Sequence, residues 1–138
     1  MIRILAGLTG EGKTKILIEM ANDLIKATKG HLVYIDEDDS HIYDLHHNIR
    51  FIKSKEYPIS DYREFIGFIC GILSQDTDIH VIYIDAIFKI VKFKNDSEVE
   101  LFIENLNKLY ETFDVDFVLS MSKSAEELPE KIQKYLTL

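Results

Sequence analysis

Four short apolar runs constrain the fold of this 138-residue chain more than any other feature. They cover residues 2–6, 31–36, 80–85 and 116–122. Each is a nearly continuous apolar stretch rather than a strict alternation of apolar and polar side chains, which is typical of strands buried on both faces of a parallel sheet. Residues 49–53 form a further candidate strand. We therefore predict an α/β protein, a three-layer sandwich with a mostly parallel sheet.

Stretches with helical periodicity separate these runs, and strands that alternate with helices form βαβ units. Gly30 is a suitable stop for the first helix, and Ser97 with Glu100 forms a capping-box pattern for the third. Pro129 fits the first turn of the last helix. The polar stretch 36–48 is expected to be a loop with one helical turn. We predict helices over residues 13–29, 61–73, 97–113 and 126–135.

Size and charge restrict the classes of protein to consider. The length fits a single domain over residues 1–138. A formal net charge of −8 argues against binding to double-stranded DNA, so no nucleic-acid partner is expected. No apolar run approaches membrane-spanning length, and the N-terminus does not resemble a signal peptide. The single cysteine, Cys70, is predicted to be a buried core residue of a cytoplasmic protein.

The stretch GLTGEGKT, residues 7–14, follows the first apolar run and precedes the first predicted helix. It matches the pattern Gly-x-x-x-x-Gly-Lys-Ser/Thr, whose glycines let backbone N–H groups and a helix N-terminus surround a phosphate. Lys13 would place its charge on the β- and γ-phosphates, as a catalytic and binding residue, and the Thr14 hydroxyl would reach Mg²⁺. The predicted nucleotide-binding residues are Gly7, Leu8, Thr9, Gly10, Glu11, Gly12, Lys13, Thr14 and Lys15.

A second motif, VIYID, ends at Asp85. Its four apolar residues bury a strand and bring the carboxylate to the carboxyl end of that strand, where it can hold Mg²⁺ through water. We therefore predict Thr14 and Asp85 as the metal site. Ser122, at the end of the last apolar run, is a candidate sensor of the γ-phosphate.

Together these motifs resemble the P-loop NTPase superfamily, in particular its RecA-like branch. The resemblance covers the whole chain as architecture, and GLTGEGKT is its specific part. The chain is also similar to small uncharacterised bacterial ATP-binding proteins, some of which are labelled twitching-motility proteins. Pilus-retraction motors carry an extra N-terminal domain and further acidic and histidine boxes for which this chain has no room, so we expect the label not to apply.

ATP is favoured over GTP because no N-K-x-D guanine motif follows a strand. Hydrolysis needs a carboxylate that orients or deprotonates water, yet Ala86 follows Asp85, where many P-loop ATPases have a glutamate. The RecA-like resemblance places the base near the end of the second apolar run, where residues 36–39 are all acidic. We predict Asp38 as the base, with Asp36 as the second candidate.

These inferences predict a Mg-dependent, slow ATPase. A nucleotide-binding switch or assembly module without turnover is an alternative. A small-molecule kinase is a further one, disfavoured because the chain has only three arginines. His41, His46 and His47 stand near Asp44 without a recognised metal-ligand spacing, so we expect them to face water. The largely apolar helix 61–73 predicts a homo-oligomer contact.

Overall fold

The computed structural model describes residues 1–10 and 12–137 and contains a five-stranded sheet in the order β1-β5-β4-β2-β3. All four strand pairs are parallel. The strands are β1 (Ile2–Ala6), β2 (His31–Asp36), β3 (Arg50–Lys53), β4 (Ile79–Ile84) and β5 (Asp116–Met121). All five predicted strands are therefore present, to within one residue at each end.

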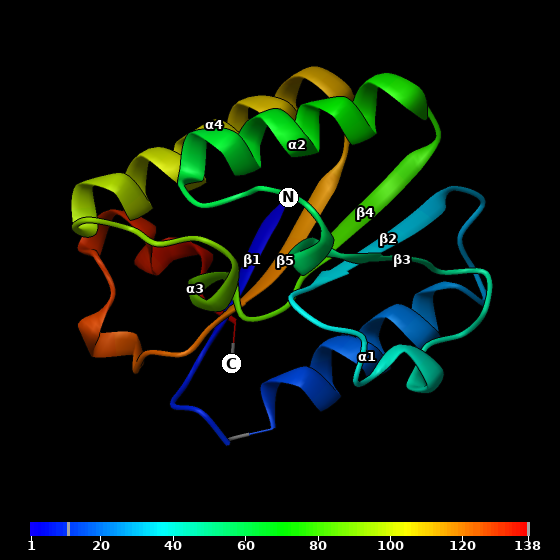
Figure 1. Ribbon diagram of the computed structural model, residues 1–138, viewed down its shortest axis with the longest axis horizontal. Helices are drawn as coiled ribbons and strands as arrows, with labels where there is room; N and C mark the ends of the chain where they lie inside the picture. The colour runs from blue at the N-terminus through cyan, green and yellow to red at the C-terminus, as the bar shows by residue number, and fades with distance from the viewer. Residues whose placement is uncertain (11, 138) are drawn as a thin grey trace.

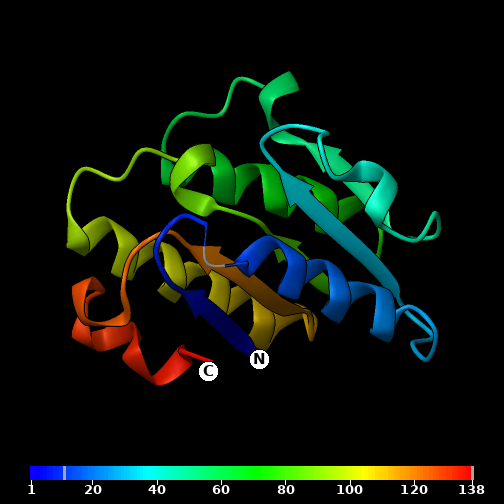
Figure 2. The ribbon, with the colours of Figure 1, turned by 90° about the horizontal axis from the view of Figure 1, so that it is seen from below.

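Helices cover both faces of the sheet. Helices α2 and α4 lie side by side on one face, and α1 lies on the opposite face (Figures 1 and 2). The predicted three-layer α/β sandwich is confirmed. The α-helices are α1 (Lys13–Leu24), α2 (Tyr62–Gln75), α3 (Ile87–Ile90) and α4 (Asp96–Phe113). The 3₁₀ segments are η1 (Ile42–Asp44), η2 (Ser54–Glu56), η3 (Ala125–Glu127) and η4 (Glu130–Tyr135).

Two hydrophobic cores explain why the strands are apolar without alternation. In β2, Val33 and Ile35 pack into the core beneath α2 and α4, whereas Leu32 and Tyr34 pack into the core beneath α1. Successive strand side chains point to opposite faces, so a strand that is covered on both sides must be apolar throughout.

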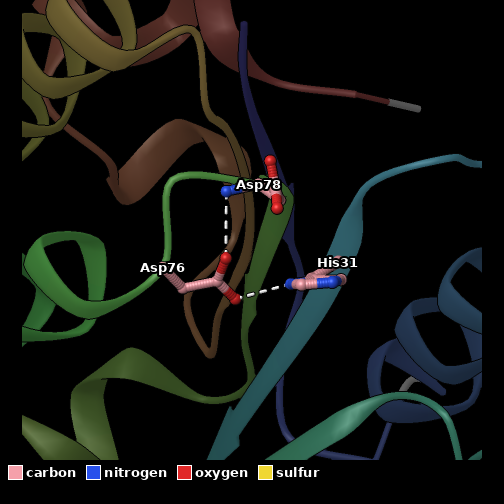
Figure 3. Close-up of side chains that lie close together, drawn as sticks. All are labelled: His31, Asp76 and Asp78. Atoms are coloured by element: carbon pink, nitrogen blue, oxygen red, sulfur yellow. Dashed lines mark hydrogen bonds and ion pairs between the residues drawn. The ribbon is translucent and has the colours of Figure 1, made fainter.

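The amino edge of the sheet carries a small polar cluster, shown in Figure 3. His31, at the start of β2, places its Nδ1 2.7 Å from a carboxylate oxygen of Asp76, and the backbone N–H of Asp78 donates to the other oxygen. The hydrogen bond raises the pKa of His31 and lowers that of Asp76. The ligand atoms of the three side chains lie within 4.8 Å of one another. The two hydrogen bonds of the Asp76 carboxylate join β2 to the turn before β4.

Helix α1 ends five residues earlier than predicted. After Leu24 the chain turns, and the N–H groups of Ala27 and Thr28 both donate to the Leu24 carbonyl. Gly30 therefore does not stop the helix. A Cβ at this position would lie 2.8 Å from the carbonyl oxygen of Asp78 and 2.9 Å from the Cβ of His80. The glycine permits a close approach to the start of β4, a tertiary requirement that helix periodicity does not reveal.

The predicted cap of the third helix was wrong by two residues. Asn95 is the N-cap of α4, and its side chain accepts a hydrogen bond from the N–H of Glu98. The Glu98 carboxylate in turn accepts from the N–H of Lys94. Asn95 and Ser97 are both good N-cap residues, and the sequence alone does not decide between two such positions so close together.

The predicted closing helix 126–135 is two 3₁₀ segments, η3 and η4. Leu128, which precedes Pro129, has extended backbone angles, as expected because proline disfavours the helical conformation of the residue before it. Gln133 stabilises this break by donating to the carbonyls of Ala125 and Leu128, at 2.7 and 2.9 Å.

Helix α2 has an apolar middle stretch, residues 65–73, between polar ends. Its inner stripe, which includes Phe65 and Ile69, is fully buried. The middle of its outer face consists of the small residues Gly67, Cys70 and Gly71, so Cys70 is exposed and not buried as predicted. No helix in the described part of the chain has the length and apolar character to span a bilayer.

Candidate functional site

The loop after β1 has the local structure that its sequence predicts. The N–H of Gly7 donates to the carbonyls of Met121 and Lys123, at 3.3 and 2.7 Å, which anchors the loop to the end of β5. Gly10 and Gly12 have left-handed backbone angles, φ 91° and 80°, which glycine adopts without strain. Gly12 is the N-cap of α1. Glu11 lies outside the described residues.

Lys13 closes this loop on itself. Its ammonium donates to the backbone carbonyls of Gly7 and Leu8, at 2.7 and 2.8 Å. The first turn of α1 contains no acidic side chain. The positive end of the helix dipole and the lysine charge therefore coincide, which creates a local site for an anion in a chain of net charge −8.

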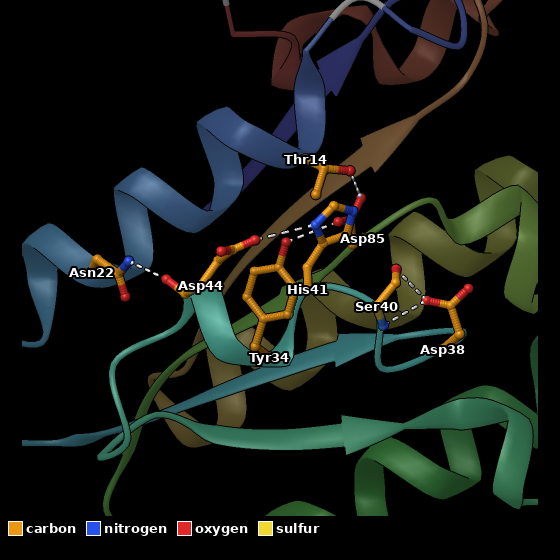
Figure 4. A network of polar contacts seen from close by, with 8 residues as sticks. All are labelled: Thr14, Asn22, Tyr34, Asp38, Ser40, His41, Asp44 and Asp85. Atoms are coloured by element: carbon orange, nitrogen blue, oxygen red, sulfur yellow. Dashed lines mark hydrogen bonds and ion pairs between the residues drawn. The ribbon is translucent and has the colours of Figure 1, made fainter.

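Asp85 joins the loop to the centre of the sheet. Its carboxylate is 2 % exposed and accepts hydrogen bonds from the hydroxyls of Thr14 (3.2 Å), Tyr34 (2.8 Å) and Ser120 (3.0 Å). Figure 4 shows how Thr14 and Tyr34 reach Asp85 from α1 and β2. Burial, then the charge of Asp85, raises the pKa of Tyr34 far above its usual range. The phenol therefore stays protonated and acts as a donor.

Strand alternation brings these groups together. Tyr34, Tyr83 and Val118 belong to the core beneath α1. Asp85 and Ser120 lie two residues after Tyr83 and Val118 and therefore point to the same side. The motifs gave no indication of Tyr34, and of the two serines that end the last apolar run, Ser122 was predicted rather than Ser120; strand alternation would have indicated both Tyr34 and Ser120.

The backbone turns sharply after Asp85. Ala86 has a left-handed conformation, φ 52°, and its N–H donates to the Ser120 hydroxyl at 2.7 Å. Ala86 therefore offers no carboxylate, and the chain passes from it directly into α3. Ser120 makes these contacts, whereas Ser122, the predicted sensor, lines the cavity described next.

A cavity of about 610 Å³ opens over the loop and the start of α1, within the usual size range of small-molecule sites. The described residues that line it include most of the predicted set: Thr9, Gly10, Gly12, Lys13, Thr14, Lys15, Asp85 and Ser122. The cavity is also lined by residues that the motifs did not assign to the site: Ile18, Glu19, His41, Asp44, Ala86, Lys89 and Ser120.

Asp36 and Asp38, the two predicted bases, are not among these lining residues. Asp36 is 8 % exposed, and burial together with the charge of Asp85 raises its pKa to about 6. Asp38 accepts hydrogen bonds from the N–H and hydroxyl of Ser40, at 3.1 and 2.7 Å, which lower its pKa. In Figure 4 Asp38 and Ser40 lie apart from Thr14 and Asp85. The assignment of either carboxylate as the base stays a prediction.

The start and end of η1 bring His41 and Asp44 to the cavity, beside α1. Asn22 of α1 donates to the Asp44 carbonyl and accepts from the N–H of His46, each at 2.9 Å. His46 and His47 stack on each other with ring centroids 4.4 Å apart. Of the three loop histidines, His41 is the one among the lining residues.

The oxygen ligands at the loop suit Mg²⁺. This ion prefers one or two carboxylates, substrate phosphates and water as ligands, and the Thr14 hydroxyl lies beside an Asp85 carboxylate oxygen. Thr14 and Asp85 would hold the ion, directly or through water. It would supply charge neutralisation of a bound phosphate.

Comparisons with known proteins concern the fold. No family model matches the chain, and no curated protein sequence matches it. The structure is similar to the crystal structure of the flagellar accessory protein FlaH from Methanocaldococcus jannaschii, with a TM-score of 0.63 and 10% sequence identity. The match covers 96% of this chain and 65% of that one, so the chain spans just under two thirds of the length of FlaH. This likeness and the all-parallel sheet fit a RecA-like fold, and nothing found supports the twitching-motility label.

Proposed function

We propose that this chain binds a nucleoside triphosphate together with Mg²⁺ and hydrolyses it slowly. One observation carries the proposal: the Thr14 hydroxyl, at the start of α1, lies 3.2 Å from the buried Asp85 carboxylate. These residues are 71 positions apart in the sequence. Their contact lies beside Lys13, so one site would offer both donors for a phosphate and oxygen ligands for a divalent cation.

The anion would be bound by charge and by backbone donors. The left-handed glycines shape the loop, the dipole of α1 points its positive end at the cavity, and Lys13 can exchange its two loop carbonyls for phosphate oxygens. Lys15 and Lys89 also line the cavity. The negative net charge of the chain is therefore locally offset where a triphosphate would lie.

ATP is the proposed nucleotide because the chain lacks a guanine-recognition motif, and the cytoplasm is the proposed location. A small-molecule kinase is disfavoured by the lining residues. Among the described residues that line the cavity, the cations are lysines and none is an arginine. Kinases of that type use the planar guanidinium group to hold two phosphorylated substrates.

A nucleotide-binding switch without turnover is the second candidate, and Ala86 favours it. This residue occupies the position after Asp85 where a glutamate would orient water, and Asp38 is not among the described residues that line the cavity. The two candidates share the binding site and differ only in whether the γ-phosphate is cleaved.

Isothermal titration calorimetry with ATP tests the binding proposal. We expect a micromolar or tighter complex with Mg²⁺ and weaker binding in EDTA, because the ion links Thr14, Asp85 and the phosphates. The same titration with GTP tests whether the site prefers adenine to guanine. Phosphate release at saturating Mg-ATP then separates an ATPase from a switch. Absence of heat at millimolar Mg-ATP and Mg-GTP would refute the proposed function.

A further inference from the structure

The cavity contains a histidine–carboxylate pair that the motifs do not explain. We propose that His41, oriented by Asp44, accepts the proton from the water that attacks the γ-phosphate. This inference rests on the proposed function. It assigns to His41 the role of base, which Ala86 cannot perform because it has no carboxylate.

The other acidic groups near the cavity are poorly suited to this role. Asp85 already accepts three hydroxyl hydrogen bonds and belongs to the metal site. Asp38 accepts from Ser40, and neither Asp38 nor the buried Asp36 is among the described lining residues. Glu19 lines the cavity and is exposed, as are His41 and Asp44, but no hydrogen bond that would orient its carboxylate is found in the described part of the chain. His41 combines a place in the cavity with an orienting partner.

The pair has the geometry of a base and its orienting group. The Nδ1 of His41 lies 3.4 Å from an Asp44 carboxylate oxygen. A carboxylate beside Nδ1 favours the tautomer with its proton there, which leaves Nε2 as a proton acceptor. In Figure 4 Asp44 approaches one ring nitrogen of His41, and the other ring nitrogen lies on the side of the ring away from Asp44. Catalytic hydrogen bonds are often this long before substrate binds.

The surrounding structure holds the pair in place. The N–H of Asp44 donates to the His41 carbonyl at 3.0 Å, which closes the η1 turn. Asn22 fixes the same turn to α1, the helix that begins at Lys13. The base would thus be attached to the phosphate-binding helix and move with it.

The proposed step is a direct displacement. The water oxygen forms a bond to the γ-phosphorus while the bond from that phosphorus to the β–γ bridging oxygen breaks. The electron pair of the broken bond stays on the ADP oxygen. The water proton moves to Nε2 of His41, and the resulting imidazolium is stabilised by the Asp44 carboxylate.

The test compares His41→Gln with His47→Gln, a variant in the same loop that is not among the described lining residues. Glutamine retains a polar side chain but accepts no proton. We expect His41→Gln to lower single-turnover hydrolysis at least about a hundredfold, with the Kd for Mg-ATP within about threefold of wild type. His47→Gln should match wild type in both. Unchanged hydrolysis in His41→Gln would refute the inference, as would a fall in affinity that parallels the loss of rate.

Two further outcomes separate this inference from the proposed function. A wild type that binds Mg-ATP without cleaving it refutes the base and leaves the binding site standing. A wild type that binds no nucleotide refutes the proposed function. Long-range ¹⁵N–¹H spectra add a readout independent of turnover: neutral His41 should carry its proton on Nδ1, and Asp44→Asn should reduce that preference. A predominant Nε2–H tautomer in wild type would contradict the orienting role.

Discussion

At the scale of single residues, Asp85 shows how one carboxylate can organise a site. It accepts hydrogen bonds from hydroxyl groups on α1, β2 and β5, and it lies at the end of β4. Buried carboxylates are costly unless they are hydrogen-bonded, so each hydroxyl offsets part of that cost. The result is a group that is already oriented before any ligand arrives.

Lys13→Ala tests the phosphate cage. Mg-ATP at a hundredfold above its Kd should stabilise the wild type by about 2.7 kcal/mol, which raises the Tm by several degrees in a thermal-shift assay. The variant should lose this increase, because the ammonium beside the loop is gone. Lys26→Ala, at an exposed position in the turn that follows α1, is the matched control and should retain it. An equal increase in both variants would contradict the assignment.

Asp36 gives a pH-dependent prediction for the nucleotide-free protein. Its pKa is about 6 in the fold and 3.8 as the ordinary value. Because the folded protein binds this proton more tightly, Asp36 costs stability above pH 6, by on the order of 3 kcal/mol, and the cost disappears as the pH falls toward 4. Asp36→Asn keeps an acceptor for the Glu37 N–H.

The measurement is urea unfolding of wild type and Asp36→Asn at pH 4.5 and pH 8 in EDTA. We expect the variant to be more stable than wild type at pH 8 and the difference to shrink at pH 4.5. A difference of the same size at both values would show that Asp36 does not titrate in this range.

At the scale of elements, the close approach between the end of the α1–β2 connection and β4 depends on Gly30. Gly30→Ala would place a methyl group within 3 Å of the Asp78 carbonyl and the His80 Cβ. We expect a loss of about 1–3 kcal/mol in the free energy of unfolding. Gly71→Ala, in the interior of α2 with nothing within 4 Å of its Cβ position, should instead stabilise by about 0.5–1 kcal/mol. Chemical denaturation of the pair would contradict this account if both changes had the same sign.

Sequence patterns predicted the elements better than their ends. The five strands followed from burial on both faces, a property that continuous apolar runs carry directly. The end of α1, the cap at Asn95 and the break before Pro129 depended on tertiary contacts or on choices between equivalent local signals. The four-residue α3 is too short to show a periodicity, so it was not predicted.

At the scale of the whole molecule, the motifs predicted which residues lie at the centre of the candidate site. They did not predict which loop residues surround it. Parallel strands end at one edge, which brings Lys13, Thr14 and Asp85 together. His41 and Lys89 reach the same cavity through a loop and a short helix, whose paths depend on contacts such as those of Asn22 rather than on strand direction.

The predicted self-association through α2 can be examined with the single cysteine. Cys70 is exposed on the small-residue face of this helix, where two copies could approach closely. We expect a short bismaleimide to cross-link two chains at Cys70, and Gly67→Arg to reduce the yield. Light scattering should show a dimer or larger species with and without Mg-ATP. A monomer by scattering that gives no cross-link would contradict the prediction.

The pairing of β1 with β5 has a consequence for the timing of synthesis. Ile2 is in register with Phe117 and Ala6 with Met121, and Ile4 forms a bridge with Leu136. A ribosome adds about 5–20 residues per second, so the phosphate loop emerges several seconds before the strand that anchors it. Until β5 arrives, Gly7 lacks the carbonyls of Met121 and Lys123, and Asp85 lacks Ser120. The nascent chain should therefore complete the proposed site only after β5 and Lys123 have been made.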